Sequence, residues 1–595
     1  MKYQAPVDDM MFLIEEWLGI ERLTGLPGFE DLDSDALRFM LEEAGRFCAS
    51  ELLPINATGD AVGAVLDSGE VRTPPGFREA YRKFVEGGWT SIDSDPEYGG
   101  QGLPRLLQFM VDEMLAACNL AFKLYTELSH GAGHLVAASA SEDLRRRYLP
   151  NMIAGRWTGT MCLTEPHCGT DLGLLNTRAT PQPDGSYRIN GTKIFITSGD
   201  HDLTENIVHL VLARVDGAPA GSHGISTFLV PRNHVREDGS VGERNSVKTG
   251  SLEHKMGIRG SATAMLHFED ATGYLVGEEN RGLVAMFTMM NIERITVGIQ
   301  GLGIAEIACQ NALDYACERL QSRAPEPRPD PSKRADPLVY HPEIRRMLLR
   351  MRSQIEGGRA LAIYTALHTD LMHRAPSPEE RKGAADTVAL LTPIVKSYLS
   401  DLAVTSSLSA QQVFGGHGYI REWGMEQLVR DSRITPIYEG TNEVQALDLV
   451  TRKLSLDGGR LVDAEFSRWA RFLEAARKDR ELEGIIGPAA AAFERLADAT
   501  GCMRQRVLED DAAARGAATE FQRLFALTTV AILWAQVVAA ISGKQGEIYE
   551  RKRKLARFYM SHVLPETIAL HKVITEGAED LAEFDAASLT GQVRA

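Results

Sequence analysis

Cysteine is scarce in this chain. Only seven occur among 595 residues, and no two form a Cys-x-x-Cys pair. Their odd number and scattered positions predict reduced thiols and argue against a disulfide framework or a zinc site. Positive charge is also in short supply, since 64 Lys and Arg face 81 Asp and Glu for a formal net charge of -17. This deficit argues against a nucleic-acid-binding protein, because affinity for phosphates comes largely from Lys and Arg.

Secretory and membrane-spanning signals are likewise weak. The first residues are polar and acidic, where a secretory signal needs a basic start and an apolar stretch. One apolar run, Leu524 to Ile541, approaches the length that crosses a bilayer, but it contains Thr528, Thr529 and Gln536. We therefore expect a cytoplasmic protein in which this run is a buried helix of a bundle.

The chain is too long for one hydrophobic core, and its 44% hydrophobic and 24% charged residues are ordinary for packed domains. From Ser34, a candidate N-cap, to about Arg156 the pattern is helical. Apolar residues recur at spacings of three and four in Ala36 to Phe47 and in Leu106 to Ala121. Between these segments, the glycines and prolines of Pro96 to Pro104 predict a loop.

After Trp157 the pattern changes to short alternating runs, which predict β-strands in a small domain ending near Gly277. The predicted strands are Tyr187 to Asn190, Lys193 to Thr197, Ile207 to Ala213 and Ile225 to Val230. Asp184-Gly and Asn190-Gly are typical turn dipeptides.

Helical periodicity resumes at Gly282 in two long segments that reach Arg319, and a proline-rich stretch from Arg323 to Pro337 breaks it. Further helices are expected from His341 to Met372 and from Ala384 to Phe414. From about Ser455 the chain is again helical and predicts a separate bundle. The predicted parts are an N-terminal extension (1–35), a helical domain (36–158), a middle β domain (159–278), a four-helix bundle (279–455) and an additional helical domain (456–595).

The segment Pro436-Ile-Tyr-Glu-Gly-Thr-Asn-Glu-Val-Gln445 is the most informative stretch. It places one carboxylate, Glu439, beside a glycine and small hydrogen-bonding residues, as a chain does when it presents a base to a flat cofactor. The alternative is a surface turn with a solvated Glu. Three other segments occur upstream: Thr164-Glu-Pro-His-Cys-Gly-Thr-Asp171, Phe195-Ile-Thr-Ser198 and Gln412-Val-Phe-Gly-Gly-His-Gly418.

In this order and spacing, the four segments resemble the acyl-CoA dehydrogenase family from about residue 36 to residue 455. The resemblance implies a mainly α protein with a middle β domain, in α/β/α domain order, to which this chain adds a C-terminal helical bundle. Long bacterial members, including the 3-methylmercaptopropionyl-CoA dehydrogenase-like group, look similar at both ends.

The resemblance also implies the chemistry. The family removes two hydrogens from an acyl-CoA thioester, one as a proton and one as a hydride. Because a protein side chain cannot accept a hydride, FAD accepts it. Glu439 matches the base that takes the α-proton, and its backbone N–H is expected to donate to the thioester oxygen. In some relatives the base instead matches Glu293, which we interpret here as an ion-pair or packing residue. If both carboxylates faced one carbon, they would titrate as a coupled pair.

The residues that match the family's binding positions fall in several segments. Expected flavin contacts are Met161, Leu163, Thr164, Gly169, Thr170, Phe195, Thr197, Arg319, Gln412, Gly415, Gly416, Thr441 and Glu443. Expected substrate contacts are Thr170, Asn291, Arg294 and Gly440. Arg319 and the Gln412 loop match residues that reach the flavin of the adjacent subunit, so a homodimer is expected. Without the family, Arg319 would be a helix C-terminal cap.

Two positions depart from the family's pattern. His167 and Cys168 replace its usual small residues, and we expect the Cys168 thiol to be inert packing. Phe195 stands where relatives often have Trp.

The predicted function is FAD-dependent dehydrogenation of a medium- to long-chain acyl-CoA in β-oxidation, with an electron-transfer flavoprotein as acceptor. The alternatives are a 3-methylmercaptopropionyl-CoA dehydrogenase, an acyl-CoA oxidase of the same fold, and a nucleic-acid-binding flavoprotein relative. Only the basic run Glu550-Arg-Lys-Arg-Lys-Leu-Ala-Arg557 favours the last, and we interpret it as a solvated helix face.

Overall fold

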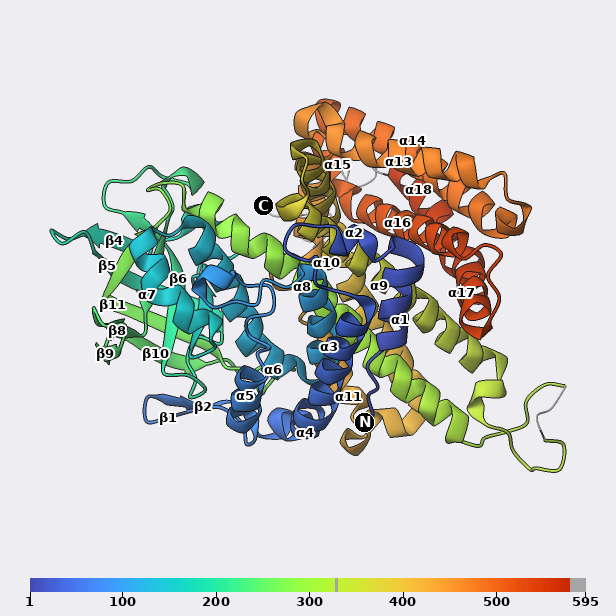
Figure 1. Ribbon diagram of the computed structural model, residues 1–595, viewed down its shortest axis with the longest axis horizontal. Coiled ribbons are helices and arrows are strands. Elements are labelled where there is room, and N and C mark those ends of the chain that lie inside the picture. Colours follow the sequence, from blue (N-terminus) through green and yellow to red (C-terminus); the bar gives the residue numbers. More distant parts are fainter. Residues whose placement is uncertain (327–329, 578–595) are drawn as a thin grey trace, which may run out of the picture. The chain divides into compact units, whose positions relative to one another are not determined.

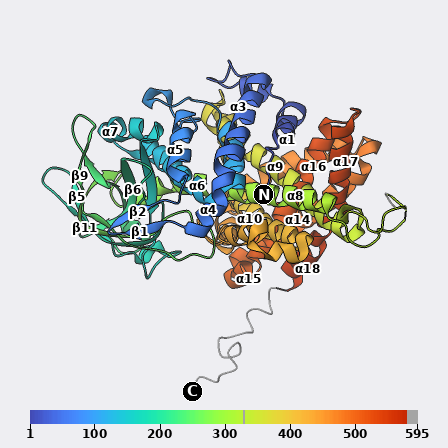
Figure 2. The same ribbon diagram turned by 90° about the horizontal axis from the view of Figure 1, so that it is seen from below.

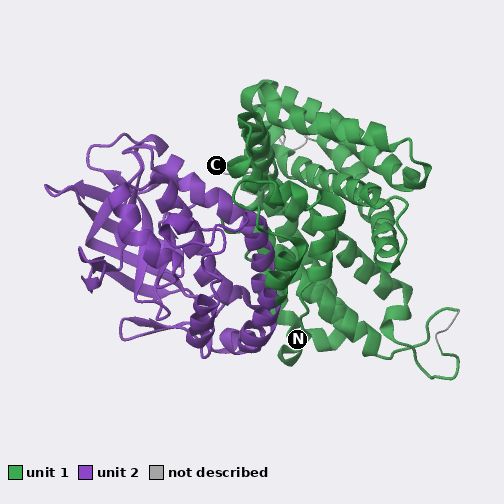
Figure 3. Cartoon of the chain, in the orientation of Figure 1, with its two compact units in different colours: residues 1–42, 297–595 green, residues 43–296 purple. Residues whose placement is uncertain are grey.

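The computed structural model describes residues 1–326 and 330–577. It divides into two compact units, one of residues 43–296 and one of residues 1–42 with 297–595 (Figure 3). The predicted proline-rich break includes residues 327–329, and the predicted additional domain includes residues 578–595; both sets lie outside the described residues. The five-part division stays a prediction.

The unit of residues 43–296 begins with helices. They are the end of α3 (Ser34–Phe47), α4 (Leu53–Val62), α5 (Phe77–Glu86), α6 (Arg105–Ser139) and α7 (Glu142–Ile153), with a hairpin of β1 (Val65–Asp67) and β2 (Glu70–Arg72). The N-cap prediction at Ser34 is wrong, because the side chain that accepts from the Ala36 N–H is that of Asp33. The predicted loop is confirmed, with one 3-10 turn at Pro96–Tyr98.

Helix α6 runs well past the predicted Ala121 because Asn119 kinks it instead of ending it. Asn119 has non-helical φ and ψ of -162° and 87°. Its side chain donates to the Leu52 carbonyl and accepts from the Phe122 N–H at 3.0 Å. Asn119 thus restarts the helix as an N-cap does, and the second half takes a new direction.

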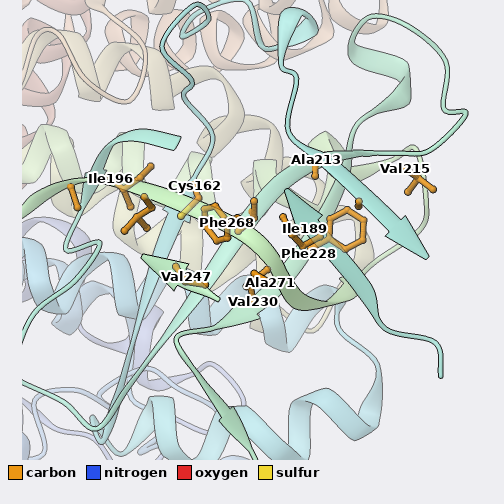
Figure 4. Close-up of a cluster of buried hydrophobic side chains, with 14 residues drawn as sticks. Cys162, Ile189, Ile196, Ala213, Val215, Phe228, Val230, Val247, Phe268 and Ala271 are labelled. Carbon is orange, nitrogen blue, oxygen red and sulfur yellow. The ribbon is translucent and has the colours of Figure 1, made fainter. Parts of the chain in front are cut away.

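A closed ring of strands forms most of the rest of this unit, which ends with the first part of α8 (Gly282–Glu318). The strands are β3 (Trp157–Cys162), β4 (Arg178–Pro181), β5 (Tyr187–Thr197), β6 (Asn206–Val215), β7 (Ser226–Pro231), β10 (Val247–Leu252) and β11 (Thr263–Val276), with a hairpin of β8 (Asn233–Val235) and β9 (Val241–Arg244). Strands β11, β5, β4 and β6 pair in that order, and β7 closes the ring by pairing with both β6 and β11. Buried side chains such as Phe228, Phe268 and Ile189 fill it (Figure 4).

The turn predicted at Asn190-Gly is wrong, since β5 continues through both residues. The Asn190 side chain bonds both the backbone N–H and the carboxylate of Asp270, at an irregularity in the pairing of β11 with β5. Asp184-Gly does form a turn, with Gly185 at φ of 83°. Strands β3, β4 and β8 to β11 were not among the predicted strands.

The other unit is helical. Its helices are α1 (Val7–Phe12), α2 (Glu21–Thr24), most of α8 (Gly282–Glu318), α9 (Pro342–Arg374), α10 (Pro378–Phe414), α11 (Met425–Ser432), α12 (Asn442–Asp448), α13 (Arg460–Ala476), α14 (Glu483–Glu509), α15 (Asp511–Gly516), α16 (Ala518–Ala540), α17 (Glu547–Phe558) and α18 (Glu566–Glu576) (Figure 1). The two segments predicted from Gly282 are one helix, α8. Gly298 and Gly301 let its backbone approach Val395 and Leu399 of α10, where added Cβ atoms would lie 2.8 and 2.3 Å from carbonyl oxygens.

The apolar run at Leu524 lies in α16, which packs against α9, α14, α17 and α18 (Figures 1 and 2). Three helices of the described chain are long and apolar enough to cross a membrane by length and composition, and α16 is one of them. Its most apolar window is 78% buried inside the protein. The prediction of a buried bundle helix is confirmed.

A fully buried ion network ties the chain ends to the bundle. Lys552 of α17 bonds Asp9 of α1 and, at 2.7 Å, Glu356 of α9. Arg359 of α9 bonds Asp9 and, at 2.7 Å, Glu306 of α8. The basic run is therefore not wholly a solvated face, because Lys552 has no exposed surface.

Candidate functional site

The predicted flavin residues of the β domain lie side by side at the ends of β3 and β5. The chain leaves β3 after Cys162 and continues alongside β5, where the Ile194 N–H donates to the Thr164 carbonyl at 3.0 Å. The buried Lys193 ammonium donates to the Leu163 carbonyl at 2.9 Å. These bonds bring Thr164 opposite Ile194, which directly precedes Phe195 on β5; Thr197 is the last residue of the same strand. Met161 lies just upstream, on β3.

Phe195 is conspicuous at this edge. The residue is 58% exposed although it lies within β5, and its φ is 58°. A non-glycine residue in the left-handed region costs on the order of 1–3 kcal/mol, and Ser198, three residues later, has a φ of 55°. Strain next to an exposed aromatic ring is typical of a binding edge.

Glu165 fixes the loop that carries Gly169 and Thr170, and the sequence reasoning missed its role. Its carboxylate accepts from Lys193 at 2.9 Å, from the Thr177 hydroxyl at 2.6 Å and from the Asn176 N–H at 2.7 Å. Burial alone would raise the pKa of Glu165, but Lys193 and these donors lower it. The middle residue of Thr-Glu-Pro is therefore an anchor.

Beyond this anchor, Gly169 and Thr170 are exposed. Cys168 is buried, and burial raises the pKa of its thiol, in line with inert packing.

Glu439 lies in the other unit, in a loop held in a strained conformation. Its φ is 56° and that of Gly440 is 83°, so two successive residues are left-handed. The Gln445 amide donates to the carbonyls of both residues at 3.2 and 3.3 Å, and the Asn442 N–H closes the loop onto the Pro436 carbonyl at 3.0 Å. The Glu439 side chain is half-buried. A surface turn has no need of this strain, so the geometry favours a functional carboxylate.

Asn442 anchors this loop to α10. Its carbonyl oxygen accepts from the Lys396 ammonium at 2.9 Å, and its amide donates to Asp401 at 2.7 Å. Thr441 is the N-cap of α12, accepting from the Val444 N–H at 3.3 Å, and a hydrogen bond from Thr441 lowers the pKa of Glu443. Thr441 and Glu443, both predicted flavin contacts, thus also interact with one another in the first turn of α12. Lys396 could have been found from the sequence, because it is a charged residue within the otherwise apolar middle of α10.

A second group of predicted flavin residues gathers where α8 and α10 end. Arg319 follows α8, and Gln412 lies in the last turn of α10. The rings of Tyr315 and Phe414 stack at 4.1 Å between their centroids and join the two ends. Gly415, at φ of 58°, and Gly416 are exposed with open space around them.

A cavity of about 30 Å³ lies within the unit of residues 43–296. One wall is apolar and aromatic, with Tyr81, Phe84, Trp89, Leu115, Met152 and Ile153, and the other is polar, with Gln108, Asp112, Glu127, His130 and Glu293. Such a volume has room for about two water molecules.

Glu293 lines this cavity and is buried. An added Cβ at Gly131 of α6 would lie 2.1 Å from a Glu293 carboxylate oxygen, so the glycine admits that carboxylate. Burial alone would lower the pKa of Lys123, but Asp112 and Glu127, and after them Glu293, raise it. Of the predicted substrate residues on α8, Asn291 is exposed, whereas Arg294 is buried with its guanidinium 5.9 Å from the centre of the Phe287 ring.

Comparison with known proteins covers nearly the whole chain. Models of the acyl-CoA dehydrogenase N-terminal, middle and C-terminal domains match residues 34–156, 160–271 and 280–454. A model described as acetyl-CoA dehydrogenase C-terminal like matches residues 465–585.

Two curated relatives match from end to end. The chain is 41% identical to the 3-methylmercaptopropionyl-CoA dehydrogenase of Ruegeria pomeroyi over 98% of this chain and 99% of that protein. It is 31% identical to the broad-specificity linear acyl-CoA dehydrogenase FadE5 of Mycobacterium tuberculosis over the same shares, 98% and 99%.

Among solved structures, an acyl-CoA dehydrogenase from Bacillus anthracis complexed with FAD superposes with a TM-score of 0.75 at 22% identity, covering 95% of this chain and 91% of that one. ACDH-11 of Caenorhabditis elegans in complex with C11-CoA superposes with a TM-score of 0.77 at 19% identity. The match covers 97% of this chain and 96% of that one. At these identities the two structures show a shared fold, and they agree with the predicted order of α and β regions.

Proposed function

Because the chain belongs to the acyl-CoA dehydrogenase family and its activity is FAD-dependent, we propose that it oxidises a short acyl-CoA, with 3-methylthiopropionyl-CoA as the natural class of substrate. The observation that carries this proposal is the end-to-end match, at 41% identity, to the relative from Ruegeria pomeroyi, whose name specifies this substrate. The medium- to long-chain substrate predicted from the sequence stays an alternative.

The residues present fit FAD. The exposed Phe195 offers a flat apolar ring, and Thr164, opposite Ile194, and Thr197, at the end of β5, offer hydroxyl groups. Gly415 and Gly416 leave open space for a close approach of backbone to a dinucleotide. When bound, FAD supplies the acceptor for the hydride that leaves the β-carbon of the substrate.

Glu439 takes the α-proton in this proposal. Its loop is fixed by Gln445 and Asn442, so the carboxylate and the neighbouring N–H groups are held in place before substrate binds. The Glu439 N–H donates to the thioester oxygen and stabilises the charge that develops there. In this proposal Glu293 is an ion-pair or packing residue, and its position against Gly131 and near Lys123 supports that role.

Electrons leave to an electron-transfer flavoprotein, and the protein works as a cytoplasmic homodimer. Three exposed large apolar side chains follow Gly415 and Gly416 in the chain, those of Tyr419, Ile420 and Trp423. Exposed apolar residues of this kind support a subunit interface at this segment. Sedimentation velocity tests the dimer.

The test of the function is anaerobic titration of the purified flavoprotein with an acyl-CoA panel, followed by bleaching of flavin absorbance. We expect 3-methylthiopropionyl-CoA and butyryl-CoA to bleach it at least about tenfold faster than palmitoyl-CoA. Equal or faster bleaching by palmitoyl-CoA contradicts the short-chain proposal. Peroxide formation in place of dye reduction would indicate an oxidase.

A further inference from the structure

The buried side chain of Asn442, which follows the Glu439 loop, is held by one short stretch of α10. Its amide makes four hydrogen bonds there, with Lys396 (2.9 Å), Ser397 (3.4 Å), Ser400 (3.2 Å) and Asp401 (2.7 Å). Two accepted and two donated bonds satisfy an amide completely. The position of Asn442, and with it the end of the Glu439 loop, is therefore set by residues 396–401.

Helix α16 supports this stretch of α10 from the C-terminal region matched at residues 465–585. It packs against both α10 and α12. The buried Gln522 amide of α16 donates to the Pro393 carbonyl at 3.1 Å. Pro393 lies inside α10 and lacks the N–H that would bond the preceding turn. Gln522 thus adds a polar contact where α10 is one hydrogen bond short, about one turn before Lys396.

The next residue of α16, Arg523, faces the same stretch. Its guanidinium lies 5.7 Å from the centre of the Tyr398 ring and donates to Glu566 of α18 at 3.0 Å. Burial raises the pKa of Asp401, and the charge of Arg523 is the first of the neighbouring influences that oppose this rise. Arg523 therefore favours the ionised form of the carboxyl group that accepts from Asn442.

Further along, α16 is fixed to α9. The Trp534 indole N–H donates to the Ser353 carbonyl at 3.1 Å. Gly357 of α9 admits the same ring, since an added Cβ there would lie 2.5 Å from Trp534 Nε1. The first turns of α16 cannot shift along the helix axis without breaking these contacts. Helix α16 is therefore a rigid support for α10.

We propose that Gln522 and Arg523 are positioning residues for the base Glu439. The proposal rests on the proposed function, in which Glu439 takes the α-proton. The two side chains of α16 hold residues 396–401 of α10, these residues hold Asn442, and Asn442 fixes the end of the Glu439 loop. A misplacement of about 1 Å slows a reaction by up to about a hundredfold. Because several contacts share the support, we expect the loss of one to slow proton removal about tenfold.

The experiment measures anaerobic flavin reduction by saturating butyryl-CoA in Gln522→Met and Arg523→Met. We expect reduction about tenfold slower in each, with FAD retained and the half-saturating butyryl-CoA concentration within about twofold of the wild type. Deuterium at the α-carbon of butyryl-CoA should slow both variants more than it slows the wild type, because removal of the α-proton becomes more limiting. A loss of stability alone leaves this isotope effect unchanged. Arg523→Lys keeps the charge and should recover most of the rate.

The matched control is Gln536→Met, about 21 Å further along the same helix at about 1.5 Å per residue. We expect it to reduce the flavin at the wild-type rate. If Arg523→Met does not fold, Gln522→Met decides. Wild-type rates and isotope effects in the folded variants, or an equal loss of rate in Gln536→Met, overturn the inference. Failure of every acyl-CoA to bleach the wild-type flavin is a different result and overturns the proposed function instead.

Discussion

Replacing Lys552 with methionine tests the buried network that joins the two ends of the chain to the bundle. Lys552 bonds Asp9 and Glu356, and its ammonium lies 4.9 and 5.7 Å from the ring centres of Phe12 and Trp534. Methionine keeps most of the volume and the contacts with the rings. The change therefore removes a charge and leaves the packing largely in place.

The expected loss of stability follows from the ion pairs that Asp9 and Glu356 lose with Lys552. Removing one partner of a buried pair costs about 3–5 kcal/mol, because the remaining charge stays buried. Asp9 keeps Arg359 and Glu356 keeps Arg551, so we expect about 3 kcal/mol, the lower end of that range. At about 2 °C per kcal/mol for a large domain, the melting temperature falls by roughly 6 °C.

Differential scanning fluorimetry of the FAD-loaded protein measures this change. The matched control is Lys554→Met on the same helix, whose side chain is 76% exposed and lies 3.8 Å from Glu550. A pair of this kind contributes about 0–1 kcal/mol. If the two variants melt within 1 °C of one another, the network does not stabilise the unit and the reasoning is refuted.

Three further predictions concern single side chains. Gly131→Ala must displace Glu293 and should destabilise the protein by about 1–3 kcal/mol, whereas Gly133→Ala, with open space around it, should stabilise its helix by up to about 1 kcal/mol; urea unfolding compares them. Burial would raise the pKa of Glu306, but Arg352 and Arg359 lower it from 4.5 to about 2, so its contribution is present above pH 4.5 and lost as the pH falls towards 2. Acid unfolding of Glu306→Gln should therefore depend less steeply on pH in that window, and an equal slope contradicts the assignment. Glu165→Gln leaves the buried Lys193 without its carboxylate and should weaken FAD retention on gel filtration, whereas the exposed Glu269→Gln should not.

Local sequence patterns predicted much of the fold. The spacing of apolar residues located α9, α10 and α16, because a helix that buries one face repeats its apolar residues every three or four positions. Asn190-Gly failed because the same dipeptide fits a hairpin turn or a strand irregularity, and pairing with Asp270 of a distant strand decides between them. The kink at Asn119 likewise depends on the Leu52 carbonyl, far away in sequence.

The candidate site was predicted as a set of positions, through the order and spacing of its motifs, and that assignment stays a prediction. Its supporting residues were not. Glu165, Asn442 and Lys193 act through partners 12 to 46 residues away, and no short pattern reports such contacts. The buried position of Lys552 was also hidden, because a basic run on a helix reads as solvated until the acidic side chains that face it are known.

The most direct test of the central claim is stopped-flow reduction of the bound flavin by 3-methylthiopropionyl-CoA without oxygen, in Glu439→Gln and in Glu293→Gln. We predict that Glu439→Gln retains its FAD but reduces it at least about a hundredfold more slowly, and that Glu293→Gln stays within about tenfold of the wild type. Undiminished reduction in Glu439→Gln, with the loss in Glu293→Gln, would contradict the assignment of Glu439 as the base.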